Sequence, residues 1–294
     1  MVRLSCEEGD GMNEQRAPKG IEWTRIVRLN FLGQRETLKG YTWNPTGGCF
    51  HGCTWNMPDG TVAECYAKTI AERFTQAYPK GFEHHYFREN QLQAPLKVKK
   101  PAGIFVGSMA DLFGKWVPEH EVLAVLDVIR RSHWHTFMLL SKNPYNLRRY
   151  SEMNGGKGIP KNAWAGISVP ANRSNDAKLA GKTFSNFLAS LYHIPVDVRF
   201  ISFEPLWFDV VPVLEKHVVL FGGLPFEWAI IGPTSSHSRV FQPNPVYVQK
   251  LLDVCDEHNI PVFFKGSLEW HPWREDFPTN MYDKEKKERI GNDT

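Results

Sequence analysis

The residues best suited to chemistry in this chain are three cysteines in one short segment, Cys49, Cys53 and Cys65. Three residues separate the first pair and eleven separate Cys53 from Cys65, and glycines stand directly before Cys49 and Cys53. Glycine lets a backbone pass close to a bulky group. Three thiolates suit a [4Fe–4S] cluster with one iron open for a substrate or cofactor, since a purely structural or electron-transfer cluster normally takes four cysteines.

Two other roles for these thiols stay open. With His51 they could form a Cys₃His zinc site, although His51 is only two residues from Cys49 and from Cys53, a tight spacing for a tetrahedral ion. They could also be buried structural thiols, although a glycine-rich segment is typical of a loop. The chain has five cysteines, an odd number that does not suggest a disulfide framework. Cys255 lies on the apolar face of an expected helix and is predicted to be a core residue.

A second group of polar residues follows short apolar runs that are typical of buried strands. Parallel strands end at the same edge of a sheet, and in β/α barrels the active site lies at that edge. We therefore expect these side chains to converge, although short polar residues also end strands without any function. Two of them, Glu204 and Lys265, could instead form an ion pair across neighbouring strands. The full group is Ser108, Asp111, Lys142, Ser168, Glu204 and Lys265.

The order of apolar runs and amphipathic segments predicts the fold. Strand-like runs end near residues 106, 140, 167, 201, 231 and 264, and helix-like segments cover residues 66–77, 119–132, 184–191 and 246–259. This alternation indicates an α/β fold with parallel strands, which right-handed crossovers would curl into a partial (β/α)6-like barrel. A doubly wound open sheet is the second candidate, but neither a Rossmann fingerprint nor a P-loop follows a strand. We expect a flexible leader over 1–20, a barrel domain over 21–273 and a charged tail over 274–294.

Composition sets limits on localisation and partners. Of the 294 residues, 42% are hydrophobic, which is enough for a sizeable core. No apolar run reaches the length of about 18 residues that a membrane span needs, and the polar N-terminus does not resemble a signal peptide, so a cytoplasmic protein is expected. The net charge is only +3. Basic clusters at 97–100, 130–131 and 148–149 are solvated faces or, as a minority interpretation, a nucleic-acid surface.

Nine segments carry a resemblance that covers most of the chain from Ile21 to Trp270. They are IEWT at 21–24, YTWNPTGGC at 41–49, ECYAKTIAERF at 64–74, IFVGSMADLF at 104–113, HTFMLLSKNP at 135–144, WAGISV at 164–169, RFISFEPL at 199–206, WAIIGP at 228–233 and IPVFFKGSLEW at 260–270. On these segments the chain resembles the phage-type three-cysteine-motif proteins, a family of the radical S-adenosylmethionine (SAM) kind related to spore photoproduct lyase.

The cysteine spacing departs from the usual radical SAM pattern. That pattern is C-x3-C-x2-C, with an aromatic residue before the last cysteine. Here eleven residues fill the second gap, Glu64 precedes Cys65, and the aromatic Tyr66 follows it. The insertion Thr54–Ala63 either loops out and leaves the ligands in place or reshapes their surroundings.

The resemblance implies a radical SAM enzyme with a barrel fold. Its [4Fe–4S] cluster would be held by Cys49, Cys53 and Cys65, and SAM at the open iron would be cleaved reductively to a 5′-deoxyadenosyl radical. Ser108, Lys142 and Ser168 would contact the ribose and the methionyl carboxylate of SAM. Asp111 would bind the ribose hydroxyls or the amino group, Tyr66 would pack near the cluster, and His51 would shield it. Glu204 and Lys265 would face SAM or the substrate and are the candidate catalytic residues.

The resemblance also suggests partners. Such an enzyme needs an electron donor such as flavodoxin or ferredoxin, and we expect a monomer. The kinship with a DNA-lesion lyase favours a nucleic-acid base as substrate, through hypermodification of a phage thymidine or lesion repair in DNA. An amino acid, a peptide or a small metabolite is the second candidate substrate. A zinc-stabilised nucleic-acid-binding protein without enzymatic activity is the alternative from another class.

Overall fold

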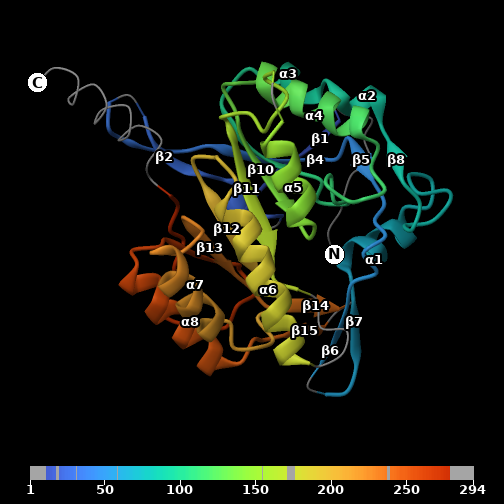
Figure 1. The fold of residues 1–294 in the computed structure, drawn as a ribbon. Helices are drawn as coiled ribbons and strands as arrows, with labels where there is room; N and C mark the ends of the chain where they lie inside the picture. Colours follow the sequence, from blue (N-terminus) through green and yellow to red (C-terminus); the bar gives the residue numbers. More distant parts are fainter. Residues whose placement is uncertain are drawn as a thin grey trace, which may run out of the picture.

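The computed structural model describes residues 11–17, 20–30, 32–57, 59–153, 155–170, 176–236 and 239–278. Its centre is an eight-stranded sheet in the order β1-β4-β9-β10-β11-β12-β13-β16 (Figure 1). The strands of this sheet are β1 (Met12–Gln15), β4 (Lys39–Trp43), β9 (Ala102–Val106), β10 (Thr136–Ser141), β11 (Ala163–Ser168), β12 (Arg199–Phe203), β13 (Trp228–Ile231) and β16 (Val262–Phe264).

The sheet has the strand order of a barrel. Each neighbouring pair from β4 to β16 is parallel, and β1 pairs antiparallel with β4 at one edge. A doubly wound sheet reverses its strand order at a switch point, whereas this order follows the chain throughout. Among the described residues β1 and β16 do not pair with each other, so the barrel is partial. The predicted α/β partial barrel with parallel strands is therefore confirmed.

Helices connect the successive parallel strands. They are α4 (Glu119–Arg131), α5 (Pro144–Ser151), α6 (Ala177–Tyr192), α7 (Val211–Phe221) and α8 (Pro245–Glu257). Helix α6 begins before the predicted segment 184–191, because the Asp176 side chain caps it by accepting from the Leu179 amide. No helix in the described part of the chain is both long and apolar enough to cross a membrane.

Shorter elements surround the sheet. They are the 3₁₀ helix η1 (Glu22–Thr24), the helices α1 (Tyr66–Arg73), α2 (Glu89–Leu92) and α3 (Ala94–Lys97), and the strand pairs β2 (Val27–Leu29) with β3 (Arg35–Thr37), β5 (Thr46–Gly47) with β8 (Tyr86–Phe87), β6 (Thr54–Asn56) with β7 (Val62–Glu64), and β14 (Thr234–Ser236) with β15 (Arg239–Phe241).

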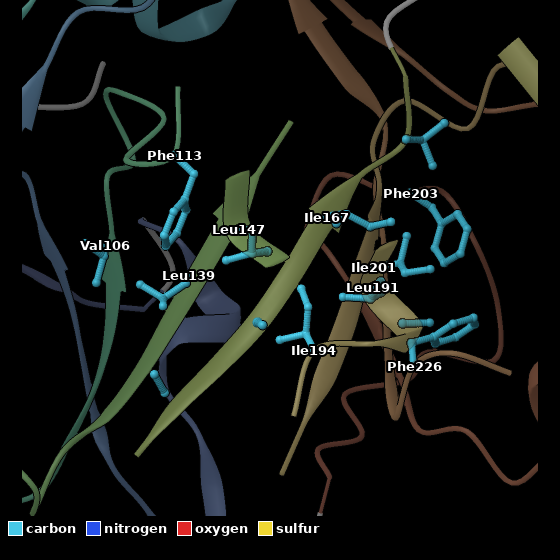
Figure 2. Close-up of a cluster of buried hydrophobic side chains, with 14 of the residues drawn as sticks. Val106, Phe113, Leu139, Leu147, Ile167, Leu191, Ile194, Ile201, Phe203 and Phe226 are labelled. Carbon is cyan, nitrogen blue, oxygen red and sulfur yellow. The ribbon is translucent and has the colours of Figure 1, made fainter. Parts of the chain in front are cut away.

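Each parallel strand sends alternate side chains to two different cores, as the two-residue period of a strand requires. The outer core packs against the helices and takes residues such as Leu139, Ile167 and Ile201 (Figure 2). The inner core takes the residues between them: Phe105, Met138, Trp164, Phe200, Trp228 and Phe263. Both faces are therefore buried, as the nearly continuous apolar runs predicted.

Trp23 of η1 fills the inner face of the curved sheet. Its ring centroid lies 4.7 Å from that of Phe105 and 6.3 Å from that of Trp228. The short helix comes this close because β4 and β9 carry glycines there. A Cβ at Gly103 would stand 2.1 Å from the Thr24 carbonyl oxygen. Aromatic side chains thus close the amino-terminal half of the inner face, and polar residues occupy its carboxyl-terminal end.

Residues from the predicted leader and from the predicted tail contact the central sheet. Met12–Gln15, expected in the flexible leader, pairs with β4 as strand β1. At the other end, the Phe264 amide donates to the Arg274 carbonyl, 2.9 Å away, and Phe277 packs in the inner core against Trp228. Phe277, an apolar residue of the predicted tail, thus covers the sheet. Residues 1–10 and 18–19 of the predicted leader and 279–294 of the predicted tail lie outside the described residues.

Candidate functional site

The cysteine segment begins where β4 ends and lies at the carboxyl edge of the sheet. Gly48 makes a parallel bridge to Ala110 in the loop after β9, and the Cys49 amide donates to the Phe82 carbonyl, 3.0 Å away. Gly48 has a φ of +79°, and a Cβ there would stand 1.8 Å from the His84 carbonyl oxygen. Only glycine fits this position, so the double glycine before Cys49 is needed to seat the loop.

The insertion between the second and third cysteines is a β-hairpin. Strands β6 and β7 pair Thr54 with Glu64 and Trp55 with Ala63. The same register, continued by one residue, sets Cys53 directly opposite Cys65. Residues opposite each other in an antiparallel pair have Cβ atoms about 5 Å apart. The eleven-residue gap in sequence therefore becomes a short distance in space.

Cys49 lies on the other side of Cys65. Both pack against the cluster formed by Ala67, Ala71, Tyr78 and Phe82, while Cys65 also packs against the hairpin cluster that contains Cys53. None of the three forms a disulfide. Burial raises the pKa of the Cys49 thiol to about 12. A cationic group or a metal at this position would therefore be needed to hold Cys49 as a thiolate at neutral pH.

Lys142 directly follows β10, and its amide donates to Asp111. Burial opposes the charge of its side chain, but the acidic groups of Cys53, Cys65, Asp111 and Cys49 outweigh this effect and raise the pKa of Lys142. The Lys142 ammonium therefore stays charged at neutral pH.

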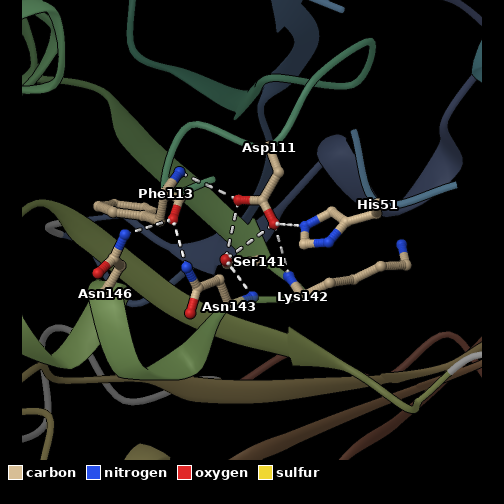
Figure 3. Close-up of polar contacts among 7 residues, drawn as sticks. All are labelled: His51, Asp111, Phe113, Ser141, Lys142, Asn143 and Asn146. Carbon is tan, nitrogen blue, oxygen red and sulfur yellow. Dashed lines mark hydrogen bonds and ion pairs between the residues drawn. The ribbon is translucent and has the colours of Figure 1, made fainter. Parts of the chain in front are cut away.

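Asp111 connects the surrounding segments (Figure 3), and it is only 5% exposed. Its carboxylate accepts from the Ser141 hydroxyl at 2.8 Å, the Lys142 amide at 2.8 Å and the Phe113 amide at 3.0 Å, and lies 2.7 Å from His51 Nε2. Burial alone would raise the pKa of Asp111, but these hydrogen bonds, that of His51 first, lower it overall. Asp111 was predicted to bind SAM, but in this structure its carboxylate oxygens accept hydrogen bonds from protein groups.

Ser108 is held by two residues. Asn44, which sequence reasoning missed, donates from Nδ2 to Ser108 Oγ at 3.1 Å and accepts from the Met109 amide at 3.0 Å. The Tyr66 hydroxyl donates to the Ser108 carbonyl oxygen at 2.6 Å. Asn44 follows β4 directly, so the strand-end pattern that selected the other polar residues would also have found it.

Tyr66 is the predicted residue that directly follows Cys65. Burial first, and then the negative groups of Cys65 and Glu204, raise the pKa of Tyr66, yet 47% of the residue remains exposed. Its hydroxyl is thus surrounded by protein while part of the side chain stays accessible to solvent. Tyr66 therefore connects the cysteine segment to Ser108 in the loop after β9.

Glu204 and Lys265 form the ion pair that the sequence left as an alternative. Lys265 Nζ lies 2.5 Å from Glu204 Oε1, and the Lys265 stem packs so closely on Gly232 that a Cβ there would be 2.7 Å from Lys265 Cδ. Ser168 is buried at the end of β11, in register with Ser202 of β12, a second polar residue that sequence reasoning missed. By strand alternation these four residues and Lys142 continue the inner face beyond its aromatic layer.

The geometry does not support the zinc alternative. His51 pairs with Asp111 instead of joining the thiols. Across the described residues, no three His, Cys, Asp or Glu side chains are already grouped as metal ligands, which applies to a cluster as much as to zinc. A single zinc ion with bonds of about 2.3 Å requires thiolates about 4 Å apart. A [4Fe–4S] cube binds each thiolate at a different iron and accommodates a wider spread.

Buried donors without acceptors surround the same segment. Trp55 Nε1, Trp116 Nε1 and a terminal nitrogen of Arg88 are buried and have no hydrogen-bond partner in the described structure. Trp55 lies on the hairpin, Trp116 packs against His51 at 4.9 Å between ring centroids, and Arg88 lies against Gly47. Indole and guanidinium nitrogens only donate. An acceptor-rich group such as an iron–sulfur cluster therefore fits the chemistry of these residues.

Comparisons with known proteins give one family and two structures. The family described as "Protein of unknown function (DUF5131)" matches residues 36–293, and no comparison names the phage-type family. No curated protein matches the sequence. A mutant of spore photoproduct lyase with bound AdoMet and dinucleoside spore photoproduct has a TM-score of 0.43 and 8% identity, over 86% of this chain and 72% of the other. Spore photoproduct lyase complexed with dinucleoside spore photoproduct gives 0.42 and 8%, over 93% and 77%.

The Asp111→Asn substitution should destabilise the protein in a pH-dependent way. The amide replaces one accepting oxygen with a donor that faces other donors, which costs about 3 kcal/mol. Because folding lowers the pKa of Asp111 below its ordinary value of 3.8, its stabilisation is complete above that pH and disappears as the pH falls through the folded value. Urea unfolding from pH 2 to 7 should show the difference from wild type shrinking at low pH. An exposed control, Asp197→Asn, should change little, and a difference independent of pH would contradict the assignment.

Proposed function

The chain belongs to the DUF5131 family, and from the geometry of its site we propose that it is a radical SAM enzyme. Cys49, Cys53 and Cys65 are the proposed ligands of a [4Fe–4S] cluster. The observation that carries the proposal is that the hairpin register sets Cys65 opposite Cys53, while Cys65 and Cys49 pack against one cluster, at the carboxyl edge of a parallel sheet. Lys142, at the end of β10, supplies a cation that suits an anionic cluster with an anionic cofactor group beside it.

The hairpin supports this ligand set despite the unusual spacing. In a C-x2-C motif a tight turn brings the first and last Cα atoms within about 7 Å. Opposite residues of an antiparallel pair lie about 5.5 Å apart between Cα atoms. Strands β6 and β7 therefore bring Cys65 as near to Cys53 as two intervening residues would. The departure from the usual spacing changes the path of the chain between the two cysteines and not the distance between them.

The residues around the thiols are proposed to bind SAM, to pack beside the cluster and to face the substrate. When bound, a cluster of this kind supplies the electron that cleaves SAM to a 5′-deoxyadenosyl radical. Lys142 neutralises the methionyl carboxylate of SAM, with Asp111 holding its backbone in place. Ser108 and Ser168 bind the polar groups of SAM from neighbouring strands, and Tyr66 packs beside the cluster. Glu204 and Lys265, paired on the opposite side of the rim, face the substrate. A flavodoxin or ferredoxin is the proposed electron donor.

Iron binding and SAM cleavage test the proposal directly. After anaerobic reconstitution, the wild-type protein should bind close to four irons and four sulfides per chain and should release 5′-deoxyadenosine from SAM once reduced. Cys65→Ala should lose most of the iron and all cleavage, because two remaining thiolates hold a cube poorly. Cys255→Ala, which removes a buried thiol of the outer core, is the matched control and should keep both. Wild-type protein that takes up iron and never cleaves SAM would defeat the proposal.

The hairpin register provides a second test. One residue inserted after Ala63 should turn Cys65 to the opposite face of the hairpin, since side chains alternate along a strand. The iron content should then fall to the level of Cys65→Ala. One residue inserted after Gly60 lengthens the turn, where a Cβ would meet nothing within 4 Å, and should leave the iron content unchanged. Equal iron in both insertion variants would show that the register does not place the third ligand.

We propose a nucleic-acid base as the substrate class, whether for modification or for repair. Two aromatic residues next to cysteines, Phe50 and Tyr66, are 45% and 47% exposed. Exposed aromatic rings beside a polar site suit stacking on a base. The basic clusters at 97–100 and 130–131 do not contribute, because they precede β9 and β10 and so lie at the opposite edge of the sheet. An amino acid, peptide or small metabolite is the alternative substrate.

Binding of a single-stranded oligonucleotide over a salt series separates these substrates. Phosphate contacts make the logarithm of the affinity fall linearly with that of the salt concentration, whereas a neutral metabolite shows no such slope. Phe50→Ala should weaken binding by about 1–3 kcal/mol, the usual contribution of one stacked base. Val219→Ala, an 83% exposed residue on α7, is the control. If the oligonucleotide fails to bind at low salt, the nucleic-acid substrate is wrong and the radical SAM assignment is unaffected.

A further inference from the structure

Trp55 stands beside two of the proposed cluster ligands. It is 7% exposed and packs with Cys53, Met57 and Ala63, and Cys65 lies against the same cluster. Trp55 follows Cys53 by two residues, so the two side chains share one face of β6. Since Trp55 is opposite Ala63, it is a diagonal neighbour of Cys65. Diagonal neighbours lie within reach of an aromatic side chain. The indole therefore borders both thiols.

The indole N–H of Trp55 is a hydrogen-bond donor without an acceptor. Its Nε1 is buried and has no acceptor among the described residues. Other tryptophans of this protein donate to backbone carbonyls: Trp43 to Gln91, Trp134 to Val98, Trp207 to Pro170 and Trp228 to Asp276. A buried donor without an acceptor costs free energy, so such groups are rare in folded proteins. Trp55, like Trp116, thus differs from these four tryptophans, and of the two it is Trp55 that packs in the cluster of Cys53 and Cys65.

The surroundings of Trp55 point to sulfur as the acceptor. Apart from the cysteines, its cluster consists of Met57, Ala63, Trp207 and Phe241, whose side chains offer no oxygen acceptor. The cysteine thiolates and the sulfides of a cluster are electron-rich acceptors. Hydrogen bonds to these sulfurs are among the factors that set the reduction potential of an iron–sulfur cluster, because they stabilise the more negative, reduced state.

We infer that Trp55 is a positioning residue whose indole N–H donates a hydrogen bond to a sulfur on the Cys53–Cys65 side of the cluster and raises its reduction potential. This inference rests on the proposed function. It assigns the hairpin a chemical role in addition to carrying Cys65, because the residue that tunes the cluster lies on the insertion itself.

The matched pair Trp55→Phe and Trp207→Phe tests the inference. Both changes keep an aromatic ring in the same cluster, but only the first removes an N–H without a protein acceptor, since the Trp207 N–H is already bound to the Pro170 carbonyl. The readout is the midpoint potential of the reconstituted cluster in an EPR-monitored redox titration without SAM. In Trp55→Phe the equilibrium constant for one-electron reduction should fall roughly threefold to tenfold, the latter being about 59 mV. Trp207→Phe should match wild type.

A second measurement uses wild-type protein, so that the inference can be tested even if Trp55→Phe loses its cluster. Wild-type protein with ¹⁵N-labelled tryptophan should show ¹⁵N coupling to the reduced cluster in pulsed EPR. Trp116→Phe should keep this coupling, because the inference assigns it to Trp55. An unchanged potential in a Trp55→Phe protein of full iron content, an equal shift in Trp207→Phe, or no ¹⁵N coupling in wild type would each overturn the inference. Wild-type protein that binds no cluster would overturn the proposed function as well, and its iron content identifies that case.

Discussion

The Asp111 carboxylate is surrounded by hydrogen-bond donors inside the protein, and it therefore has to stay ionised. Its partners come from three places: the loop after β9, the end of β10 and, through His51, the cysteine segment. A buried charge of this kind is stable only while all its donors remain in place. One carboxylate thus fixes the relative positions of three segments that are far apart in sequence. It also binds the Lys142 amide and so fixes the backbone at the end of β10.

The two faces of the sheet determine what can surround that centre. The outer face is covered by helices, so the strand residues proposed to bind a cofactor or substrate lie on the inner face. There a layer built from Trp23, Trp164, Phe200 and Trp228 fills the amino-terminal half. Gly166 lets this layer close, since a Cβ there would be 2.4 Å from the Phe200 ring. Further along the strands the inward positions include the polar residues Ser168 and Ser202, so the aromatic layer is the floor of the proposed site.

Much of this arrangement could be predicted from the sequence because it follows local rules. Apolar runs ending in polar residues located the strands and selected Lys142, Ser168, Glu204 and Lys265, and the helical period identified Cys255 as a core residue, which is fully buried. Asp111 lies in the loop after β9, but its partners on β10 depend on tertiary packing that no local pattern encodes. The same holds for Phe277, an apolar residue in a charged segment, and for β1, whose polar sequence pairs only because β4 offers a free edge.

The hairpin between Cys53 and Cys65 could not be predicted from the sequence. The spacing of the two cysteines gives the number of residues between them, not the structure that those residues form. In the usual motif two residues separate the second and third cysteines. The longer segment is therefore not needed to bring Cys65 close to Cys53. Its buried residues Trp55, Met57 and Ala63 pack against Trp207 after β12 and Phe241 on β15. The hairpin therefore links the segment after β4 to loops from the far half of the sheet. In a partial barrel, whose first and last strands do not meet, that contact joins the two halves of the rim at the cysteines.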